Sequence, residues 1–169
     1  ELTGVFNRRH FAALMQPYES EPDARIGLVM VDIDHFKRVN DNLGHAAGDL
    51  VLKEVARRLQ SLGREHDCVV RWGGEEFVLV LPDASLHGLP LMAKRLLETV
   101  ATQPIRIGSQ QFHVSVSAGC VVHPLEPGSP WEHALKLADT AMYRAKRHGR
   151  NRAACVAMPD VPPGHDGGP

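Results

Sequence analysis

The sequence predicts an α/β sandwich, in which a central, mostly antiparallel sheet of about five strands is surrounded by helices. The first observation is the order of the expected elements, which runs helix, strand, helix, hairpin, helix, hairpin, helix. The second is a glycine pair, Gly73 and Gly74, that joins two runs rich in β-forming residues. The third is a chain of 169 residues with 43% hydrophobic content, which is long enough for one compact domain with its own core.

The two ends of the chain set the expected domain bounds. Turn and cap residues lead into a short helix over residues 10–15, which Pro17 is expected to end. The chain starts at Glu1 without a signal peptide or a methionine, so we expect a segment of a longer polypeptide. Residues 158–169 are rich in proline and glycine and are expected to be a disordered tail. One folded domain over residues 1–157 is therefore predicted.

A continuous apolar run from Ile26 ends in two acids, Asp32 and Asp34, which is typical of a buried central strand whose end reaches a cleft. Both acids would face the same side of an ideal strand. Asp34 also precedes the next helix and could cap its first turn, so Asp32 is the stronger metal-binding candidate. Together with a hairpin carboxylate, Asp32 would supply the oxygen ligands that Mg²⁺ prefers, whereas zinc and iron are disfavoured.

The hairpin around Gly73 and Gly74 is expected to have a two-residue turn, in which the glycines supply positive φ angles. A turn without Cβ atoms lets an anion approach the backbone closely. The acids Glu75 and Glu76 would then serve a metal that bridges carboxylate and phosphate. The alternative is an ordinary solvated hairpin tip, because Gly-Gly turns with flanking glutamates are common.

The remaining elements follow from helical and strand periodicity. Residues 50–62 are expected to form an amphipathic helix, with Leu50 on its apolar face and Arg58 on its polar face. The others are, in order, a helix over 85–101, a hairpin that pairs 104–107 with a half-buried strand over 112–122, a helix over 131–146 and an edge strand over 153–157.

Charge and cysteine content exclude several classes of function. The 19 basic and 20 acidic residues give a formal net charge of -1, so no nucleic-acid partner is expected. No apolar run is long enough to cross a membrane. Cys68, Cys120 and Cys155 lie far apart in strand-like contexts without metal-ligand spacing, so we expect reduced core residues of a cytosolic protein. None of the ten histidines forms a zinc-finger or metalloprotease pair.

Several motifs occur together in one order along the chain. They are Leu2-Thr3-Gly4 with Asn7-Arg8-Arg9, the run from Phe36 to Asp49, the heptad Arg71-Trp72-Gly73-Gly74-Glu75-Glu76-Phe77 and the ending from Lys146 to Asn151. This set resembles the GGDEF domain of diguanylate cyclases, in its GGEEF spelling, from Leu2 to Asn151. The resemblance implies the palm-like fold of nucleotidyl cyclases. It also implies condensation of two GTP into cyclic di-GMP with loss of two pyrophosphates, with Mg²⁺ as cofactor and Mn²⁺ as its alternative.

The family pattern assigns the metal and the chemistry to the end of the central strand and the hairpin. Asp32, the Ile33 carbonyl and Glu75 would hold the metal. Glu75 is also the usual candidate for the general base, although a metal-bound carboxylate is a weak base, and Glu76 could share either role. The sequence does not separate these two assignments.

The pattern also assigns substrate contacts. Asp49 would accept from the two adjacent donors of the guanine edge, and the Asn40 amide would add a further bond to the base. The residues expected to contact phosphate are Lys37, Lys146 and Arg150, and those expected near the substrate are His45, Gly73 and Gly74. Without the resemblance, Asn40 is explained by a turn, Asp49 by a helix N-cap and Lys146 by the dipole at a helix C-terminus.

An Arg-x-x-Asp pair, Arg64 and Asp67, lies just before the hairpin. Many GGDEF proteins carry their product-inhibition site here, so the resemblance makes both residues candidate ligands for cyclic di-GMP, with Arg95 completing the site from a neighbouring helix or a partner subunit. Arginine suits this role because its planar fork binds phosphate or a guanine edge bidentately. The alternatives are a solvated ion pair in the loop and, for Arg95, an ordinary surface arginine.

The resemblance implies further partners. One site holds one GTP, so activity would require a homodimer in which two domains face each other. An upstream sensory or regulatory domain would be missing from this segment, and it could anchor the bacterial parent protein to the membrane while this domain is cytoplasmic. Two rival functions stay open: a degenerate module that binds nucleotide without turnover, and a cyclase of different base choice, against which Asp49 argues.

Overall fold

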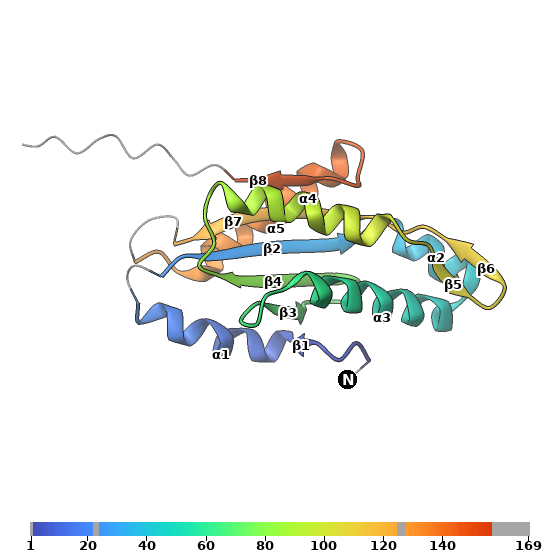
Figure 1. Cartoon of the computed structure of the whole chain (residues 1–169), viewed down its shortest axis with the longest axis horizontal. Helices are drawn as coiled ribbons and strands as arrows, with labels where there is room; N and C mark the ends of the chain where they lie inside the picture. Colours follow the sequence, from blue (N-terminus) through green and yellow to red (C-terminus); the bar gives the residue numbers. More distant parts are fainter. Residues whose placement is uncertain (1, 22–23, 125–127, 157–169) are drawn as a thin grey trace, which may run out of the picture.

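The computed structural model describes residues 2–21, 24–124 and 128–156, which form a sheet with helices on both faces (Figure 1). The strands of the main sheet lie in the order β1-β3-β4-β2-β7-β8. Their bounds are Phe6–Asn7 (β1), Ile26–Ile33 (β2), Cys68–Arg71 (β3), Glu76–Pro82 (β4), Val116–His123 (β7) and Ala153–Cys155 (β8). The three inner pairings are antiparallel, whereas β1 is parallel to β3 and β8 is parallel to β7. The predicted mostly antiparallel sheet is confirmed, with six strands.

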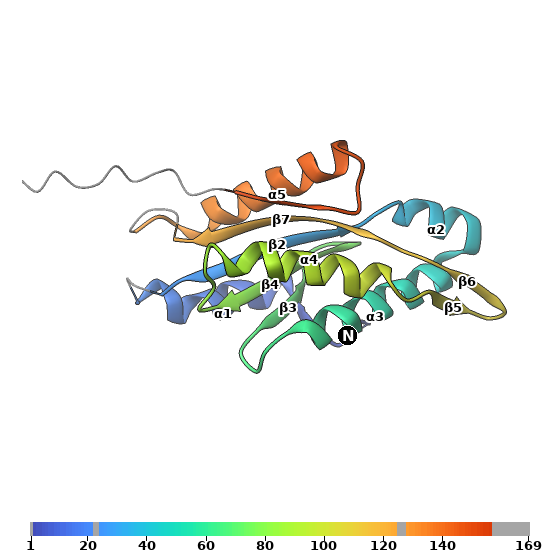
Figure 2. The same cartoon turned by 45° about the horizontal axis from the view of Figure 1, so that its top comes forward.

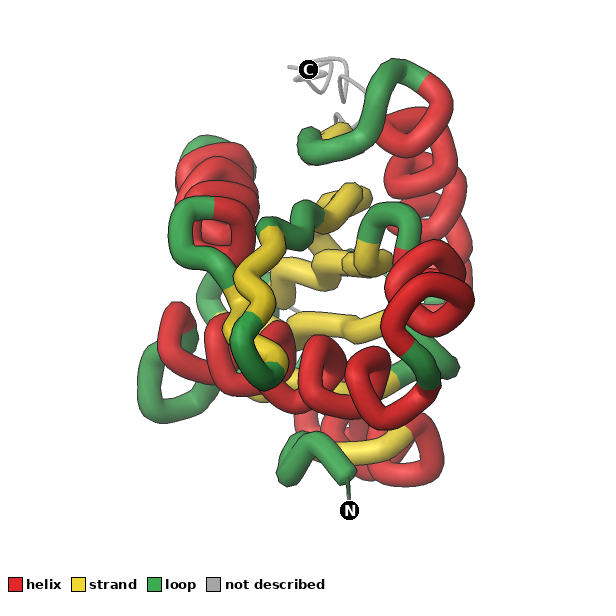
Figure 3. Tube along the Cα trace, turned by 90° about the vertical axis from the view of Figure 1, so that its right-hand side faces the viewer, coloured by secondary structure: helices red, strands yellow, loops and turns green. Residues whose placement is uncertain are grey.

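Two helices cover each face of this sheet. The helices of the described residues are Arg8–Glu19 (α1), Phe36–Leu43 (α2), His45–Leu62 (α3), Gly88–Ala101 (α4) and Trp131–Arg147 (α5). α3 and α4 pack in one apolar core, and α1 and α5 pack in another. Figure 2 shows α3 and α4 in front of the strands, and Figure 3 shows the sheet between helices on both sides. No helix in the described ranges has the length and apolarity needed to span a bilayer.

β2 is the central strand, and all eight of its residues are buried. Its side chains alternate between the two cores: Val31 packs with the α3 and α4 side, and Met30 packs with the α1 and α5 side. This confirms the predicted buried strand. Because Asp32 has the same parity as Met30, it faces the layer that contains α5.

The loop between β3 and β4 differs from the predicted turn. It comprises residues 72–75, and neither Gly73 nor Gly74 has a positive φ angle. Hydrogen bonds close the loop instead, because the Trp72 and Gly73 N–H groups both donate to the Glu76 carbonyl oxygen, at 2.8 and 3.3 Å. The Arg71 guanidinium also donates to the Gly74 carbonyl oxygen, at 2.9 and 3.3 Å. The expectation of a two-residue turn with left-handed glycines is therefore wrong.

The second predicted hairpin is divided into two parts. Ile105–Ile107 (β5) pairs with Gln110–Phe112 (β6) in a separate two-stranded sheet, and the main sheet resumes only at β7. β7 is buried along its whole length, so the half-buried strand predicted over 112–122 is wrong. The reason is that helices cover both faces. On the α5 side the contact is so close that a Cβ on Gly119 would overlap the Ala138 carbonyl oxygen.

Several element ends also move. α1 continues through Pro17 to Glu19, because a proline in the last turn removes one hydrogen bond without ending the helix. α3 begins at His45 rather than at Leu50, and α4 begins at Gly88 rather than at residue 85. The predicted edge strand is confirmed as β8, whereas Ala157 and the expected disordered tail lie outside the described residues.

Two residues of α3 are on the opposite face from the one predicted. Leu50 is 45% exposed, whereas Arg58 is only 4% exposed. The Arg58 guanidinium donates to the carbonyl oxygens of Val100, Gln103 and Pro104, at 2.6, 2.7 and 3.4 Å. These carbonyls lie at and just after the end of α4, where the helix leaves carbonyl groups unsatisfied. Arg58 therefore joins α3 to the C-terminus of α4.

The cysteines also differ from the prediction. Cys120 is buried, as expected, but Cys155 is exposed and Cys68 is intermediate. Cys120 and Cys155 are register partners on the parallel strands β7 and β8. The expectation that all three are separate core residues is wrong, because β8 lies at the edge of the sheet beside β7.

Candidate active site

The candidate site is built around the C-terminal end of β2. In the sheet, Asp32 pairs in register with Glu76 of β4 on one side and with Ser117 of β7 on the other. The next residue, Ile33, donates its N–H to the Glu75 carbonyl oxygen at 3.3 Å. The antiparallel pairing of β2 with β4 thus brings together the strand-end acid and the two hairpin acids that the sequence analysis selected.

Helix α5 adds a lysine to this site. The Lys146 Nζ lies 2.8 Å from the Asp32 Oδ2, and the Asp32 side chain is 7% exposed. Lys146 lies in the last turn of α5, where a positive charge is also favoured by the helix dipole. Its side chain, however, reaches a carboxylate in the sheet rather than the carbonyls of its own helix. The dipole alone therefore does not explain this lysine.

The electrostatics of the site favour a cation. Burial raises the pKa of Asp32 to about 6; the hydrogen bond and charge of Lys146 oppose this shift, and the charges of Glu75 and Glu76 add to it. Burial also raises the pKa of Glu76, with a contribution from Asp139, while Lys146 opposes it. Lys146 and Arg8 offset only part of the negative charge of these neighbouring carboxylates, and a divalent ion fits the excess negative charge.

The protein supplies only part of a metal coordination sphere. Within the described ranges, no group of three or more His, Cys, Asp and Glu side chains is arranged to hold a metal ion. A magnesium ion commonly takes one or two carboxylates from the protein and completes its octahedron with water and substrate phosphates. The donor set at Asp32 and Glu75 fits that arrangement.

Asp34 has a structural role instead. Its carboxylate accepts hydrogen bonds from the Ser115 and Ser117 hydroxyls at 2.6 and 2.7 Å, and from the Asn151 N–H at 2.9 Å. It does not cap α2, because His35 is the residue at that N-cap and makes no side-chain cap. Asp34 therefore ties β2 to β7 and to the loop after α5. No sequence signal identified these partners.

The guanine candidates lie on two consecutive helices. Asn40 is in α2, and its side chain packs so closely on Gly48 that a Cβ there would overlap the Asn40 amide oxygen. Asp49 follows Gly48 in α3 and is exposed. Both alternative explanations are wrong, because Asn40 is helical rather than in a turn, and the N-cap of α3 is Gly44 rather than Asp49.

The other substrate candidates are not joined to Asp32 by a described interaction. Lys37 and His45 are exposed near the starts of α2 and α3. Arg150 is exposed in the loop after α5 with a φ of 61°, and its N–H donates to the Ala145 carbonyl oxygen at 3.1 Å. Of the three predicted phosphate contacts, only Lys146 is placed directly at the acids.

The Arg-x-x-Asp segment forms a compact turn between α3 and β3. The Arg64 N–H donates to the Asp67 Oδ2 at 2.8 Å, and the Asp67 N–H donates to the Arg64 carbonyl oxygen at 3.1 Å. The described ion pairs do not include one between these side chains, so the predicted alternative of a loop ion pair is wrong. The side chains of Arg64 and of Arg95 on α4 are exposed.

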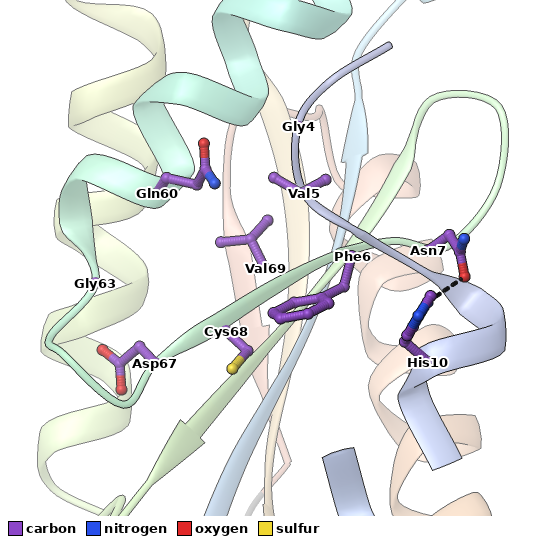
Figure 4. Close-up of a pocket in the computed structure, with 10 residues that line it drawn as sticks. All are labelled: Gly4, Val5, Phe6, Asn7, His10, Gln60, Gly63, Asp67, Cys68 and Val69. Atoms are coloured by element: carbon purple, nitrogen blue, oxygen red, sulfur yellow. Dashed lines mark hydrogen bonds between the residues drawn. The ribbon is translucent and has the colours of Figure 1, made fainter. Parts of the chain in front are cut away.

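Figure 4 shows a pocket of about 370 Å³ beside this turn, lined by the N-terminal segment, the end of α3 and β3. Asp67 belongs to its lining, but none of the residues predicted to contact GTP does. A different pocket, of about 480 Å³, includes Glu76, Trp72 and Arg8 and therefore borders one of the three acids of the candidate site. The pocket in Figure 4 is thus separate from the candidate active site.

An aromatic cluster that was not predicted from the sequence supports the hairpin loop. The Arg8 guanidinium lies 4.5 Å from the centre of the Trp72 ring, in a cation–π contact. Phe11 packs edge-on against both Trp72 and Trp131, with ring centres 5.2 and 5.0 Å apart. These contacts join α1 and α5 to the residue that precedes Gly73. The arginines after Asn7 and the tryptophan before the glycine pair were the available signals.

The central strand of the mostly antiparallel sheet thus ends in an acid, beside an acidic hairpin loop. Residues 1–152 match the family described as "Diguanylate cyclase, GGDEF domain". The chain belongs to this GGDEF family.

The most informative relatives agree with this assignment. Diguanylate cyclase DgcP of Pseudomonas aeruginosa is 41% identical over 157 residues, which cover 89% of this chain and 23% of that protein. The GGDEF domain of DgcB from Caulobacter crescentus, solved in complex with c-di-GMP, superposes with a TM-score of 0.85 at 30% identity, covering 92% of this chain and 90% of that one. Diguanylate cyclase SiaD of Pseudomonas aeruginosa, solved with its activator SiaC, has the same TM-score at 37% identity, covering 92% and 60%. The chain spans less than half the length of the curated relatives that it matches.

Proposed function

We propose that this chain is a diguanylate cyclase domain, which condenses two GTP into cyclic di-GMP and releases two pyrophosphates. The observation that carries the proposal is the cluster of Asp32, Glu75, Glu76 and Lys146 at the end of β2 in a chain of the GGDEF family. Positioning and charge neutralisation supply most of the catalysis in phosphoryl transfer, and this cluster offers both.

A divalent metal, Mg²⁺ with Mn²⁺ as its alternative, would be held by Asp32, Glu75 and the Ile33 carbonyl. When bound, such an ion supplies Lewis-acid stabilisation of a phosphate and lowers the pKa of a nearby hydroxyl. Its positive charge at Asp32 would weaken the attraction that now holds Lys146 there. Lys146 would then be free to neutralise the triphosphate of GTP, together with Lys37 and Arg150.

Glu75 and Glu76 would provide the metal-binding carboxylate and the general base. Glu75 would hold the metal, and either Glu75 or Glu76 would accept the proton of the attacking 3′-hydroxyl. The raised pKa of Glu76 favours it as the proton acceptor, because a general base is most effective when its pKa is near the working pH. Gly73 and Gly74 would lie beside the phosphates, with His45 nearby.

Asp49 and Asn40 would select guanine. A carboxylate at Asp49 accepts from both N1–H and the exocyclic amine, whereas adenine would turn a ring acceptor toward it. Asn40 is fixed against Gly48, one residue before Asp49, which favours a shared contact with the base. The structure of the DgcB domain in complex with c-di-GMP supports a guanine-containing product for this family.

Each site would hold one GTP, so the reaction requires two domains that face each other. The 3′-hydroxyl of the GTP in each domain would attack the α-phosphate of the GTP in the other domain, and pyrophosphate would leave. Cyclic di-GMP would also inhibit, through Arg64 and Asp67 with Arg95. An upstream regulatory domain of the parent protein would bring two copies together; the part matched here is less than half of the length of the curated relatives. The isolated segment would then depend on its own concentration for activity.

The test is a product analysis with Glu75→Ala. The parent chain, incubated with GTP and Mg²⁺, should release pyrophosphate and form cyclic di-GMP, whereas ATP alone should give no product. Glu75→Ala should form none while it keeps the parent circular dichroism spectrum. Pyrophosphate release by Glu75→Ala at the parent rate would contradict the metal role. Binding of cyclic di-GMP by the parent without any turnover at high concentration would indicate a binding module instead.

A further inference from the structure

Cys120 and Cys155 are neighbours in the sheet although they are far apart in the sequence. On the parallel strands β7 and β8, Ala118 pairs with Ala153, and Cys120 pairs with Cys155. Residues at paired positions of adjacent strands project from the same face of a sheet. The Val156 N–H donates to the Cys120 carbonyl oxygen at 2.8 Å, which holds the register just beyond the pair.

The distance between such positions suits a disulfide. Adjacent strands lie about 4.8 Å apart, and the Cα atoms of bridged cysteines lie about 4.4–6.8 Å apart. β8 has only three residues and occupies the edge of the sheet, so a small movement can bring its cysteine into bonding geometry. Figure 1 shows β8 at one edge of the sheet, beside β7.

We propose that Cys155 is a modification site for peroxides and that Cys120 is its resolving thiol, so that oxidation links β8 to β7 by a disulfide. The two cysteines differ in access, because Cys155 is exposed and Cys120 is buried. A small oxidant therefore meets Cys155 first. Cys120 is protected from the oxidant and is already in place to react with the product.

The thiols also polarise each other in the direction that this chemistry requires. The neighbouring Cys120 thiol lowers the pKa of Cys155 to about 7, against an opposing effect of burial. The Cys155 thiol, together with burial, raises the pKa of Cys120. The thiolate is the form that attacks peroxides, so Cys155 is partly in its reactive form near neutral pH. Cys68 has no such partner, and burial raises its pKa.

The chemistry takes place in two balanced steps with hydrogen peroxide as the oxidant. The Cys155 sulfur attacks one peroxide oxygen, a sulfur–oxygen bond forms, the oxygen–oxygen bond breaks, and the other oxygen leaves as water after taking a proton. The Cys120 sulfur then attacks the Cys155 sulfenic acid, a sulfur–sulfur bond forms, and the hydroxyl leaves with the Cys120 proton as a second water. The two thiols lose two hydrogens, and the peroxide is reduced to two waters.

The experiment treats the full 169-residue chain with a small excess of hydrogen peroxide at pH 7.5. Free thiols are counted under denaturing conditions, and tryptic peptides are analysed without reduction. Two of the three thiols should disappear, and one peptide pair should contain Cys120 and Cys155 joined with a mass loss of about 2 Da. Dithiothreitol should restore both thiols. Thermal unfolding should move to a higher temperature on oxidation and return on reduction, because the cross-link constrains the unfolded chain.

Three variants serve as controls. Cys68→Ser should behave as the parent, because it keeps the proposed pair. Cys155→Ser should keep the Cys120 thiol free after treatment. Cys120→Ala, which places no polar atom in the core, should yield a Cys155 sulfenic acid that dimedone traps, without an internal link.

Three results would overturn the proposal. One is oxidation of Cys68 at least as fast as that of Cys155 in the parent. Another is a link that joins two chains through Cys155 in place of the internal one. The third is oxidation of parent Cys155 to sulfinic acid with Cys120 still free. The circular dichroism spectrum of each variant identifies misfolding, and if Cys120→Ala misfolds, the parent and Cys68→Ser decide the result.

Discussion

The Lys146 Nζ lies 2.8 Å from the Asp32 Oδ2, and this ion pair joins the last turn of α5 to the end of the central strand. Lys146, which we propose contacts phosphate, therefore lies against Asp32, which we propose binds the metal. In contrast, Asp34, two residues along, accepts hydrogen bonds from two serines and a backbone N–H. The two acids therefore have different roles, which mutation can separate.

Asp32→Asn should abolish cyclic di-GMP formation and leave the free energy of unfolding at pH 7 unchanged or higher, because it removes a buried charge that the fold does not favour. Asp34→Ala should instead lose about 2–4 kcal/mol of stability, because buried donors lose their acceptor. Urea unfolding measures both effects. Equal losses of stability in the two variants would contradict this division of roles.

The stability of the metal-free chain should depend on pH through Asp32. Its folded pKa is raised from 3.8 to about 6, so the folded state binds this proton more tightly than the unfolded state. The resulting stabilisation is fully present below about pH 4 and is lost as the pH rises through about 6. Relative to Asp32→Asn, the parent should therefore gain about 1–3 kcal/mol between pH 7 and pH 4.

Urea midpoints of the parent and Asp32→Asn at a series of pH values measure this difference. A constant difference between the two proteins from pH 7 to pH 4 would contradict the raised pKa.

The affinity of the chain for Mg²⁺ should depend on pH in the direction opposite to that of the stability, because the ion must displace the Asp32 proton. Its affinity should fall as the pH is lowered through about 6, which calorimetric titration with Mg²⁺ measures.

Arg58→Met should lose about 3–5 kcal/mol of stability, because the carbonyls after α4 lose their donor and Glu54 loses a partner. Arg57→Met is the matched control, because Arg57 also pairs with Glu54 but is 63% exposed. It should lose less than about 1 kcal/mol. Chemical unfolding of both variants provides the comparison, and similar losses would show that the buried carbonyl contacts of Arg58 contribute little.

Arg64→Ala should keep its turnover of GTP and lose inhibition by cyclic di-GMP, with a rise of about tenfold or more in the inhibitory concentration. The Arg64 side chain is exposed, and the turn is held by its backbone, so the local fold should persist. The measurement is a pyrophosphate-release assay with added cyclic di-GMP. Unchanged inhibition in Arg64→Ala would assign the inhibitory site to other residues.

Local sequence patterns predicted the helices and strands whose apolar residues form a clear pattern within one continuous segment. The apolar run from Ile26 gave a central strand, and the periodicity over 131–146 gave α5 to within one residue. The motif from Phe36 to Asp49 and the heptad around Gly73 gave the family. Prediction failed where a neighbour determined the environment, as for β7, which two helices cover, and for Arg58, which α4 buries.

The sequence by itself determined the strand and helix types, the acids of the hairpin and the family, because periodicity and motif spacing are properties of one continuous stretch. Only the tertiary structure decided that Lys146 pairs with Asp32, that Asp34 binds Ser117, and that Cys155 lies beside Cys120. The physical reason is that these contacts depend on strand register and on how α5 packs across the sheet. Both are determined by the packing of the whole core, which no single segment encodes.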